Sequence, residues 1–290
     1  MTKVYRNFTR EELDREYNIA AYVGNTQRYF ADYNSRSESV RREIGGSLDN
    51  PYGSSTAETL DIFFPDRRAN CPIHVFFHGG GYRSQDKGNF SYVAGPLIAA
   101  GAIVVIPNYG LCPAYRMNEI VHQVRCSIAW VHANARIMGG DPNAITISGH
   151  SAGAHAVARL LETDWSSHGR TPDDVIKAAI AISGMYDQEP RRLSYLNEFV
   201  RLDEEESLRN SCIYRTPRRR VPFLIAVGGL ENPEYIRQSC EYAAALRGRS
   251  YDVEYMVVPD HNHYDIVLDP LLDFSRPLGA KLRSFALEHK

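Results

Sequence analysis

Short apolar runs alternate with longer amphipathic ones along most of this chain. From residue 56 onward, seven runs are nearly continuously apolar, as buried parallel strands are. The predicted strands are 59–64, 73–77, 102–107, 144–148, 178–182, 222–227 and 253–257. Between them apolar residues recur at helical spacing, and the predicted helices are 89–100, 116–137, 152–162, 233–247 and 271–287. This alternation predicts an α/β fold, with a mostly parallel sheet flanked by helices.

Two segments interrupt the alternation. Residues 1–50 are polar and rich in tyrosine, with apolar positions at roughly helical spacing, and predict an N-terminal helical cap segment. Residues 184–220 form a polar insertion, whose acidic and basic runs are explained by a solvated surface. Because 290 residues are enough to bury one large core, we expect a single domain over residues 1–290.

Composition and charge narrow the class of protein. The hydrophobic content of 43% and charged content of 23% are those of a soluble globular protein. A net charge of −2 gives no field that would attract nucleic acid or an anionic membrane, so the expected partner is a small molecule. The five cysteines form no CxxC pair, and neither a signal peptide nor an apolar run of 18 residues is present. We therefore expect a cytoplasmic protein without a metal or another cofactor; a homodimer is compatible with the sequence.

A G-x-S-x-G pattern at residues 149–153 carries the first chemical signal. It lies between a predicted strand and a predicted helix, which is the setting of a nucleophile elbow. The two glycines allow a turn so tight that side chains at their positions would collide. An ordinary Gly-Ser turn is the alternative, but the flanking strand and helix favour the elbow. Ser151 is therefore the predicted nucleophile.

A glycine-rich loop follows the predicted strand 73–77 and reads His-Gly-Gly-Gly-Tyr over residues 78–82. The carboxyl ends of parallel strands are where open α/β sheets build their sites. Backbone amides of Gly79, Gly80 and Gly81 are thus candidates to bind an oxyanion, together with the amide of Ala152. A plain glycine-rich hairpin is the alternative, although this loop followed by an elbow is a more specific signal than either alone.

A serine hydroxyl needs a base, and in this strand order the base follows the last strand. His261 and His263 both come just after the predicted strand 253–257, and position alone does not choose between them. An acid should follow the preceding strand. Glu231 is favoured over Glu234, which already belongs to a predicted first helical turn, and Asp187 is a further alternative.

With these motifs in place, the chain resembles the arylformamidase (kynurenine formamidase) branch of the α/β-hydrolases, near the hormone-sensitive-lipase-like esterases. The resembling segments are 16–18, 78–82 with 86–87, 109–113, 149–155, 183–187, 231–235 with 237–239, and 263–267. The resemblance implies an α/β-hydrolase fold with about eight strands. It assigns the catalytic roles to Ser151, His263 and Glu231. A glutamate stands at 231 where many relatives have aspartate, and a third glycine precedes the aromatic residue of the 78–82 loop where many arylformamidases have two.

The resemblance also implies the activity, namely serine hydrolysis that removes a formyl or similar small acyl group from an aryl amide or ester. N-formylkynurenine is the first compound to test. Residues Tyr17, Tyr22, Tyr82 and His150 are expected to contact the substrate, although packing of the cap segment explains its tyrosines equally well. A general short-chain carboxylesterase or amidase is the alternative function, and a non-catalytic binding relative is a third.

Overall fold

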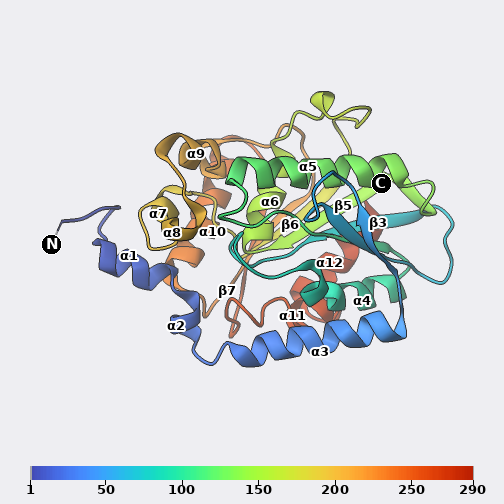
Figure 1. The fold of residues 1–290 in the computed structure, drawn as a ribbon, viewed down its shortest axis with the longest axis horizontal. Helices are drawn as coiled ribbons and strands as arrows, with labels where there is room; N and C mark the ends of the chain where they lie inside the picture. The colour runs from blue at the N-terminus through green and yellow to red at the C-terminus, as the bar shows by residue number, and fades with distance from the viewer. Residues whose placement is uncertain (1, 290) are drawn as a thin grey trace.

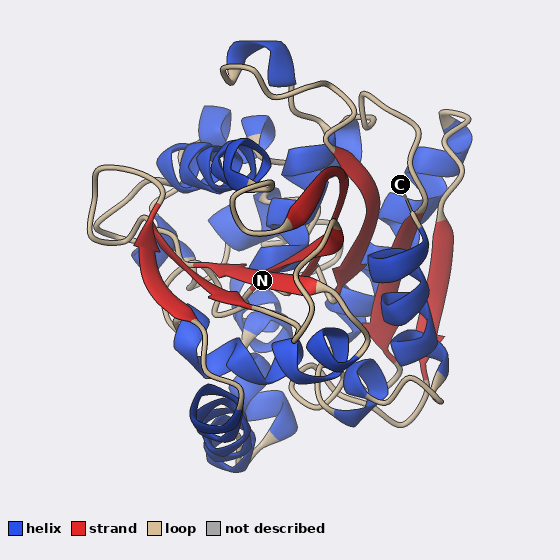
Figure 2. Ribbon diagram, turned by 90° about the vertical axis from the view of Figure 1, so that its right-hand side faces the viewer, coloured by secondary structure: helices blue, strands red, loops and turns tan. Residues whose placement is uncertain are grey.

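The computed structural model describes residues 2–289, and eight strands of this part of the chain form one sheet. Their order is β1-β2-β4-β3-β5-β6-β7-β8. Strand β2 runs antiparallel to β1 and β4, and the remaining pairs are parallel. The bounds are β1 (Ser47–Pro51), β2 (Thr59–Phe63), β3 (Cys71–Phe77), β4 (Ile103–Pro107), β5 (Gly140–His150), β6 (Ile176–Ile182), β7 (Phe223–Gly228) and β8 (Glu254–Val258). The predicted mostly parallel α/β sheet is confirmed, and Figure 2 shows its twist between helices on both faces.

Helices connect these strands. The N-terminal segment contains α1 (Arg10–Tyr17), α2 (Ile19–Val23) and α3 (Gln27–Glu43). The helices between the strands are η1 (Lys87–Val93), α4 (Ala94–Ala99), α5 (Met117–Asn134), α6 (Ala152–Leu161), η2 (Trp165–Ser167), α7 (Glu189–Arg192), α8 (Asn197–Val200), α9 (Glu204–Arg209), η3 (Cys212–Tyr214) and α10 (Pro233–Gly248). After β8 come α11 (Asp269–Leu272) and α12 (Pro277–Glu288).

Two details differ from the sequence-based expectation. Strand β1 was not predicted, because its sequence Ser-Leu-Asp-Asn-Pro is mostly polar and half exposed, as an edge strand can be. The predicted helix 271–287 is divided in two, and Pro277 begins α12. Proline fixes its backbone for a first helical turn and cannot donate the hydrogen bond that a continuous helix would need.

The sheet separates two apolar cores because successive strand residues face opposite sides. Val75 and its equivalents on neighbouring strands pack with α5, α6 and α10, whereas Phe76 and its equivalents pack with α3, α4 and α12. Figure 1 shows α5 and α6 on one side of the sheet and α3, α4 and α12 on the other. A third cluster joins Leu13 and Tyr17 of α1 to the segment after β6 and to α10. The N-terminal segment thereby lies beside the carboxyl ends of the central strands.

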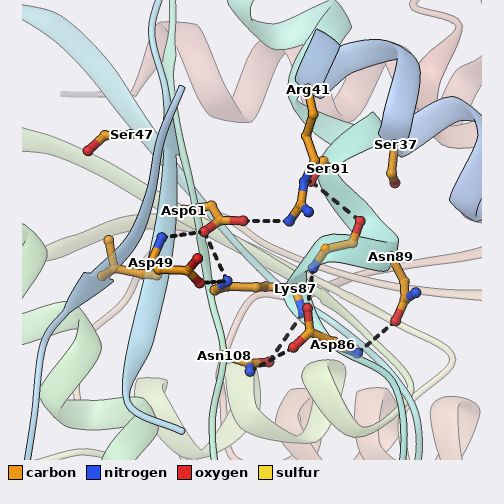
Figure 3. A network of polar contacts seen from close by, with 12 residues as sticks. Ser37, Arg41, Ser47, Asp49, Asp61, Asp86, Lys87, Asn89, Ser91 and Asn108 are labelled. Carbon is orange, nitrogen blue, oxygen red and sulfur yellow. Dashed lines mark hydrogen bonds and ion pairs between the residues drawn. The ribbon is translucent and has the colours of Figure 1, made fainter. Parts of the chain in front are cut away.

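A buried ionic network anchors the loop that follows β3 (Figure 3). Asp61 of β2 is fully buried and accepts a hydrogen bond from Arg41 Nη2 of α3 at 2.7 Å. Lys87 Nζ, which is itself nearly buried, lies 3.0 Å from Asp61 and 2.6 Å from Asp49 of β1. Asp86 caps η1 through the amide of Gly88 at 2.7 Å. These contacts join α3, β1 and β2 to one end of the glycine-rich loop.

Replacing Lys87 by alanine should destabilise the fold by about 3 kcal/mol, because a buried carboxylate would lose one of its two cations. Urea unfolding of the purified variant measures this loss. Lys281→Ala is the matched control, since Lys281 pairs with Glu254 on the exposed surface and such pairs contribute about 1 kcal/mol or less. Equal losses in the two variants would contradict the assignment of a stabilising role to the network.

Acidification should destabilise the protein through His74, which is fully buried between Thr146 Oγ1 at 2.9 Å and Ser148 Oγ at 2.7 Å. Burial lowers the pKa of His74 to about 3, whereas a histidine in the unfolded chain titrates near about 6.5. Its contribution is therefore complete above pH 6.5 and is lost as the pH falls toward 3, with about 2 kcal/mol lost between pH 7 and 5. Urea unfolding at both pH values should show a smaller difference for His74→Gln. An unchanged difference would refute this assignment.

Candidate active site

The nucleophile elbow is visible in the backbone at the junction of β5 and α6. Ser151 has φ 56° and ψ −113°, a conformation that non-glycine residues rarely adopt. A Cβ added to Gly149 would lie 2.3 Å from the carbonyl oxygen of Gly153, and one added to Gly153 would lie 2.0 Å from that of Phe77. Both glycines are therefore required by close backbone approach, as the sequence motif predicted.

The predicted histidine and acid meet in a buried contact. His263 Nδ1 lies 2.7 Å from Glu231 Oε2, and both side chains are almost fully buried. The other carboxylate oxygen accepts hydrogen bonds from the Gly228 amide at 2.7 Å and from Ser183 Oγ at 2.5 Å. Because a carboxylate accepts the Nδ1 proton, the Nε2 atom of His263 is left as the basic nitrogen.

The other candidate residues have different partners. His261 Nδ1 lies 3.2 Å from Asp265. Glu234 accepts hydrogen bonds from Arg237 Nε at 2.6 Å and from the hydroxyl of Tyr17 at 3.1 Å. Asp187 accepts one from Tyr5 at 2.8 Å. Among the alternatives that position in the sequence had left open, Glu231 and His263 are the acid and histidine whose side chains contact each other.

Ser151 and His263 line the same cavity of about 260 Å³, and Gly80, Gly81 and His150 line it as well. Within residues 2–289 no direct hydrogen bond joins the Ser151 hydroxyl to His263. Catalytic contacts of this kind are often long in the free enzyme and tighten when substrate binds. The cavity therefore holds a hydroxyl, a base and a glycine-rich loop on one surface.

The glycine-rich loop has the backbone geometry of an oxyanion site. Gly80 has φ 108° and Gly81 φ 63°, and a Cβ on Gly80 would lie 1.9 Å from the carbonyl oxygen of Ser84. In the described part of the chain, the amides of Gly80, Gly81 and Ala152 donate to no protein acceptor. Gly79 lies outside the cavity lining, and its added Cβ would lie 3.3 Å from Ser151 Cβ. Of the four candidate residues, Gly80 and Gly81 line the cavity, and Ala152 directly follows Ser151.

Two of the four residues expected to contact substrate are not in the cavity lining. Tyr17 and His150 line it, but Tyr82 is fully buried in the core and its hydroxyl lies 2.9 Å from His155 Nδ1. Tyr22 is 55% exposed and borders a separate surface hollow. The expectation for these two tyrosines is corrected, since Tyr82 has a positive φ of 57° and turns into the core while α2 leaves Tyr22 outside.

Other aromatic and charged residues line the cavity instead. The rings come from α3, η1, the insertion, α10 and the loop after β8; they are Phe30, Tyr33, Phe90, Tyr195, Tyr235 and Tyr264. Sequence reasoning missed Arg83, Arg191, Tyr195 and Tyr235. Arg83 directly follows the glycine-rich loop, which was an available signal, whereas the insertion carries no motif that marks Arg191 or Tyr195.

His150 contacts both the ring and the backbone of His263. Its Nε2 lies 2.8 Å from the carbonyl oxygen of His263, and because a carbonyl can only accept, Nε2 carries the proton. The two rings are 4.7 Å apart between centroids. Burial lowers the pKa of His150 well below its ordinary value, so the ring is neutral and adds no charge beside the base.

A strained serine on an elbow, a buried carboxylate-histidine pair and unpaired loop amides on an eight-stranded α/β sheet define a hydrolase of the α/β-hydrolase fold. Comparison with known proteins agrees. The BD-FAE family matches residues 60–186. Kynurenine formamidase of Danio rerio is 31% identical over 278 residues, which cover 91% of this chain and 92% of that protein. The chain belongs to the kynurenine formamidase family and is an arylformamidase-like serine hydrolase.

Esterases are also among the relatives. Esterase LipC of Mycobacterium tuberculosis is 28% identical over 75% of this chain and 59% of its own length. A thioesterase candidate from Silicibacter sp. has a solved structure with a TM-score of 0.82 and 27% identity, covering 93% of this chain and 98% of that one. The esterase of Pyrobaculum calidifontis shares the fold with a TM-score of 0.70 at 16% identity, covering 96% and 98%. Among the described residues, no helix has the length and apolar character needed to cross a membrane.

Exchange of Glu231 for glutamine should lower kcat about 10⁴-fold, because an amide no longer holds the imidazole in the tautomer that leaves Nε2 basic. Steady-state hydrolysis of an aryl ester or formanilide measures the effect. Glu234→Gln is the control: Glu234 is just as buried and only three residues away, but it contacts Arg237 and Tyr17 rather than His263. If the Glu234 variant loses as much activity as the Glu231 variant, the assignment of the acid is wrong.

Proposed function

We propose that Ser151, His263 and Glu231 act as a catalytic triad that removes a formyl or similar small acyl group from an aryl amide or ester. One observation carries the assignment: a buried histidine held by a carboxylate at 2.7 Å shares a cavity with a serine on a strained elbow. That arrangement is how a weakly nucleophilic hydroxyl is activated.

In this mechanism Ser151 Oγ attacks the carbonyl carbon of the substrate while His263 Nε2 accepts the hydroxyl proton. The tetrahedral oxyanion receives hydrogen bonds from the amides of Gly80 and Ala152. Collapse breaks the bond to the aryl amine or alcohol, and His263 returns the proton to that leaving group. A water molecule then attacks the acyl-enzyme by the same route, so that the acid is released and Ser151 regains its proton.

Two features support an aryl substrate. Aromatic rings from several elements line the cavity, including Phe30, Tyr235 and Tyr264, and they offer surfaces on which a planar leaving group stacks. The relatives from Danio rerio and Salmo salar, both 31% identical, carry the name kynurenine formamidase. N-formylkynurenine is therefore the first substrate to test. A cytoplasmic location and a homodimer remain predictions from the sequence.

A short-chain carboxylesterase is the second candidate, and the relatives named as esterases favour it. The same triad serves either reaction, because amide and ester cleavage differ mainly in the leaving group that His263 must protonate. The ratio of kcat/KM for a formanilide to that for a short-chain p-nitrophenyl ester separates the two functions. A ratio far below one would favour the esterase.

Ser151→Ala should lower kcat by about 10⁴- to 10⁶-fold while the fold is retained. Hydrolysis of N-formylkynurenine and of p-nitrophenyl acetate measures the loss, and a fluorophosphonate should label the wild-type protein at this residue alone. Ser284→Ala is the control and should match the wild type, because Ser284 is a partly exposed residue of α12 whose hydroxyl bonds Glu288. Full activity of the Ser151 variant on both substrates would end the serine-hydrolase mechanism proposed here.

A further inference from the structure

The cavity contains a buried cation that the triad does not use. Arg191 lies on α7 in the polar insertion, is 1% exposed, and lines the same cavity as Ser151 and His263. Its Nη2 donates to the carbonyl oxygen of Gly81, while Nε is buried without a partner among the described residues. No aspartate or glutamate of residues 2–289 forms an ion pair with it. The comparably buried Arg159, in contrast, pairs with Glu162.

The surroundings of Arg191 do not compensate its charge. Its guanidinium carbon lies 5.7 Å from the centre of the Tyr82 ring, which is a weak contact. Arg83, at the exposed edge of the cavity, adds a second cation that has no carboxylate partner in the described chain and instead lies over the Phe199 ring at 4.6 Å. The other titratable nitrogen groups of the cavity lining are those of His150 and His263. Among residues 2–289, no aspartate or glutamate lines the cavity.

A purely structural role does not account for this charge. The hydrogen bond to the Gly81 carbonyl requires only a donor, which a neutral side chain can supply. An unpaired buried cation costs several kcal/mol of desolvation, and burial accordingly lowers the pKa of Arg191. A guanidinium nevertheless stays protonated at neutral pH and presents donors that match a carboxylate in a bidentate manner. The cavity is therefore electrostatically complementary to an anion.

We propose that Arg191, assisted by Arg83 at the entrance, binds a carboxylate that the substrate carries in addition to its scissile acyl group. This inference rests on the proposed function and assigns to Arg191 the selection of acidic aryl amides over neutral ones. Arg191 bonds the carbonyl of Gly81, and Gly81 adjoins the proposed oxyanion donor Gly80. The carboxylate site and the reacting carbonyl thus belong to one continuous surface, on which the aromatic rings hold the part of the substrate between them.

A matched substrate pair tests the proposal without any mutation. N-formylkynurenine carries a free carboxylate, and its carboxamide keeps the same aryl formamide and size but is neutral there. The wild-type enzyme should hydrolyse the acid with a kcat/KM about 10- to 100-fold higher, as expected for a hydrogen bond to a charged group. The difference should appear mainly in KM, because the carboxylate is bound equally in the ground and transition states.

Variants then assign the effect to residues. Arg191→Met should lower kcat/KM for the acid about 10- to 100-fold more than for the carboxamide, while Arg191→Lys should retain part of the preference. Arg83→Met, at an exposed position, should give a smaller and salt-dependent loss on the acid alone. Circular dichroism and fluorophosphonate labelling verify that each variant is folded with an intact serine.

The outcomes separate the two proposals. Equal kcat/KM values of the wild type for acid and carboxamide would overturn the carboxylate site and leave the triad untouched. Equal losses on both compounds in Arg191→Met would also overturn it, because they would show that Arg191 acts only on the Gly81 carbonyl. Hydrolysis of neither compound by a wild-type protein that cleaves p-nitrophenyl acetate would contradict the proposed formamidase function, and the substrate class inferred here with it.

Discussion

Glu231 and His263 meet because β6, β7 and β8 are adjacent parallel strands whose carboxyl ends lie at the same edge of the sheet. Glu231 follows β7, Ser183 follows β6, and His263 lies in the loop after β8. Ser183 adopts a positive φ of 58°, and its hydroxyl fixes one oxygen of Glu231 while the other faces the imidazole. A buried carboxylate with three donors is held rigidly, so the position of the base is set by backbone geometry.

The glycine-rich loop at the other side of the cavity is held by an ionic network and by a hydrogen bond from the insertion. Lys87, at the start of η1, is joined through Asp61 to β2 and α3, and Arg191 of the insertion binds the carbonyl of Gly81 in the glycine-rich loop. Residues 2–50 and 184–220 therefore complete a site whose chemical groups come from the central sheet. Ser151 and Ala152 lie at the junction of β5 and α6, whereas the loop that carries Gly80 is contacted by Arg191 at the carbonyl of Gly81.

Much of this architecture could be predicted from the sequence because each signal was local. Seven strands were recognisable as apolar runs, and the elbow combined a five-residue motif with a strand before it and a helix after it. The choice of Glu231 over Glu234 followed from its place between strand and helix. The direction of Tyr82 could not be predicted, because it depends on one positive φ. Arg191 could not be predicted either, because only the folded structure shows that this arginine is buried without a carboxylate partner.

The electrostatics of the cavity link the base to the unpaired arginine. In the proposed mechanism His263 becomes a cation when it takes the proton of Ser151, and the carboxylate of Glu231, 2.7 Å from Nδ1, would stabilise that charge. A guanidinium in the same cavity opposes it, since like charges repel more strongly away from water. The neutral state of His150 fits the same argument, because a second charged ring 4.7 Å from His263 would oppose the proposed proton transfer.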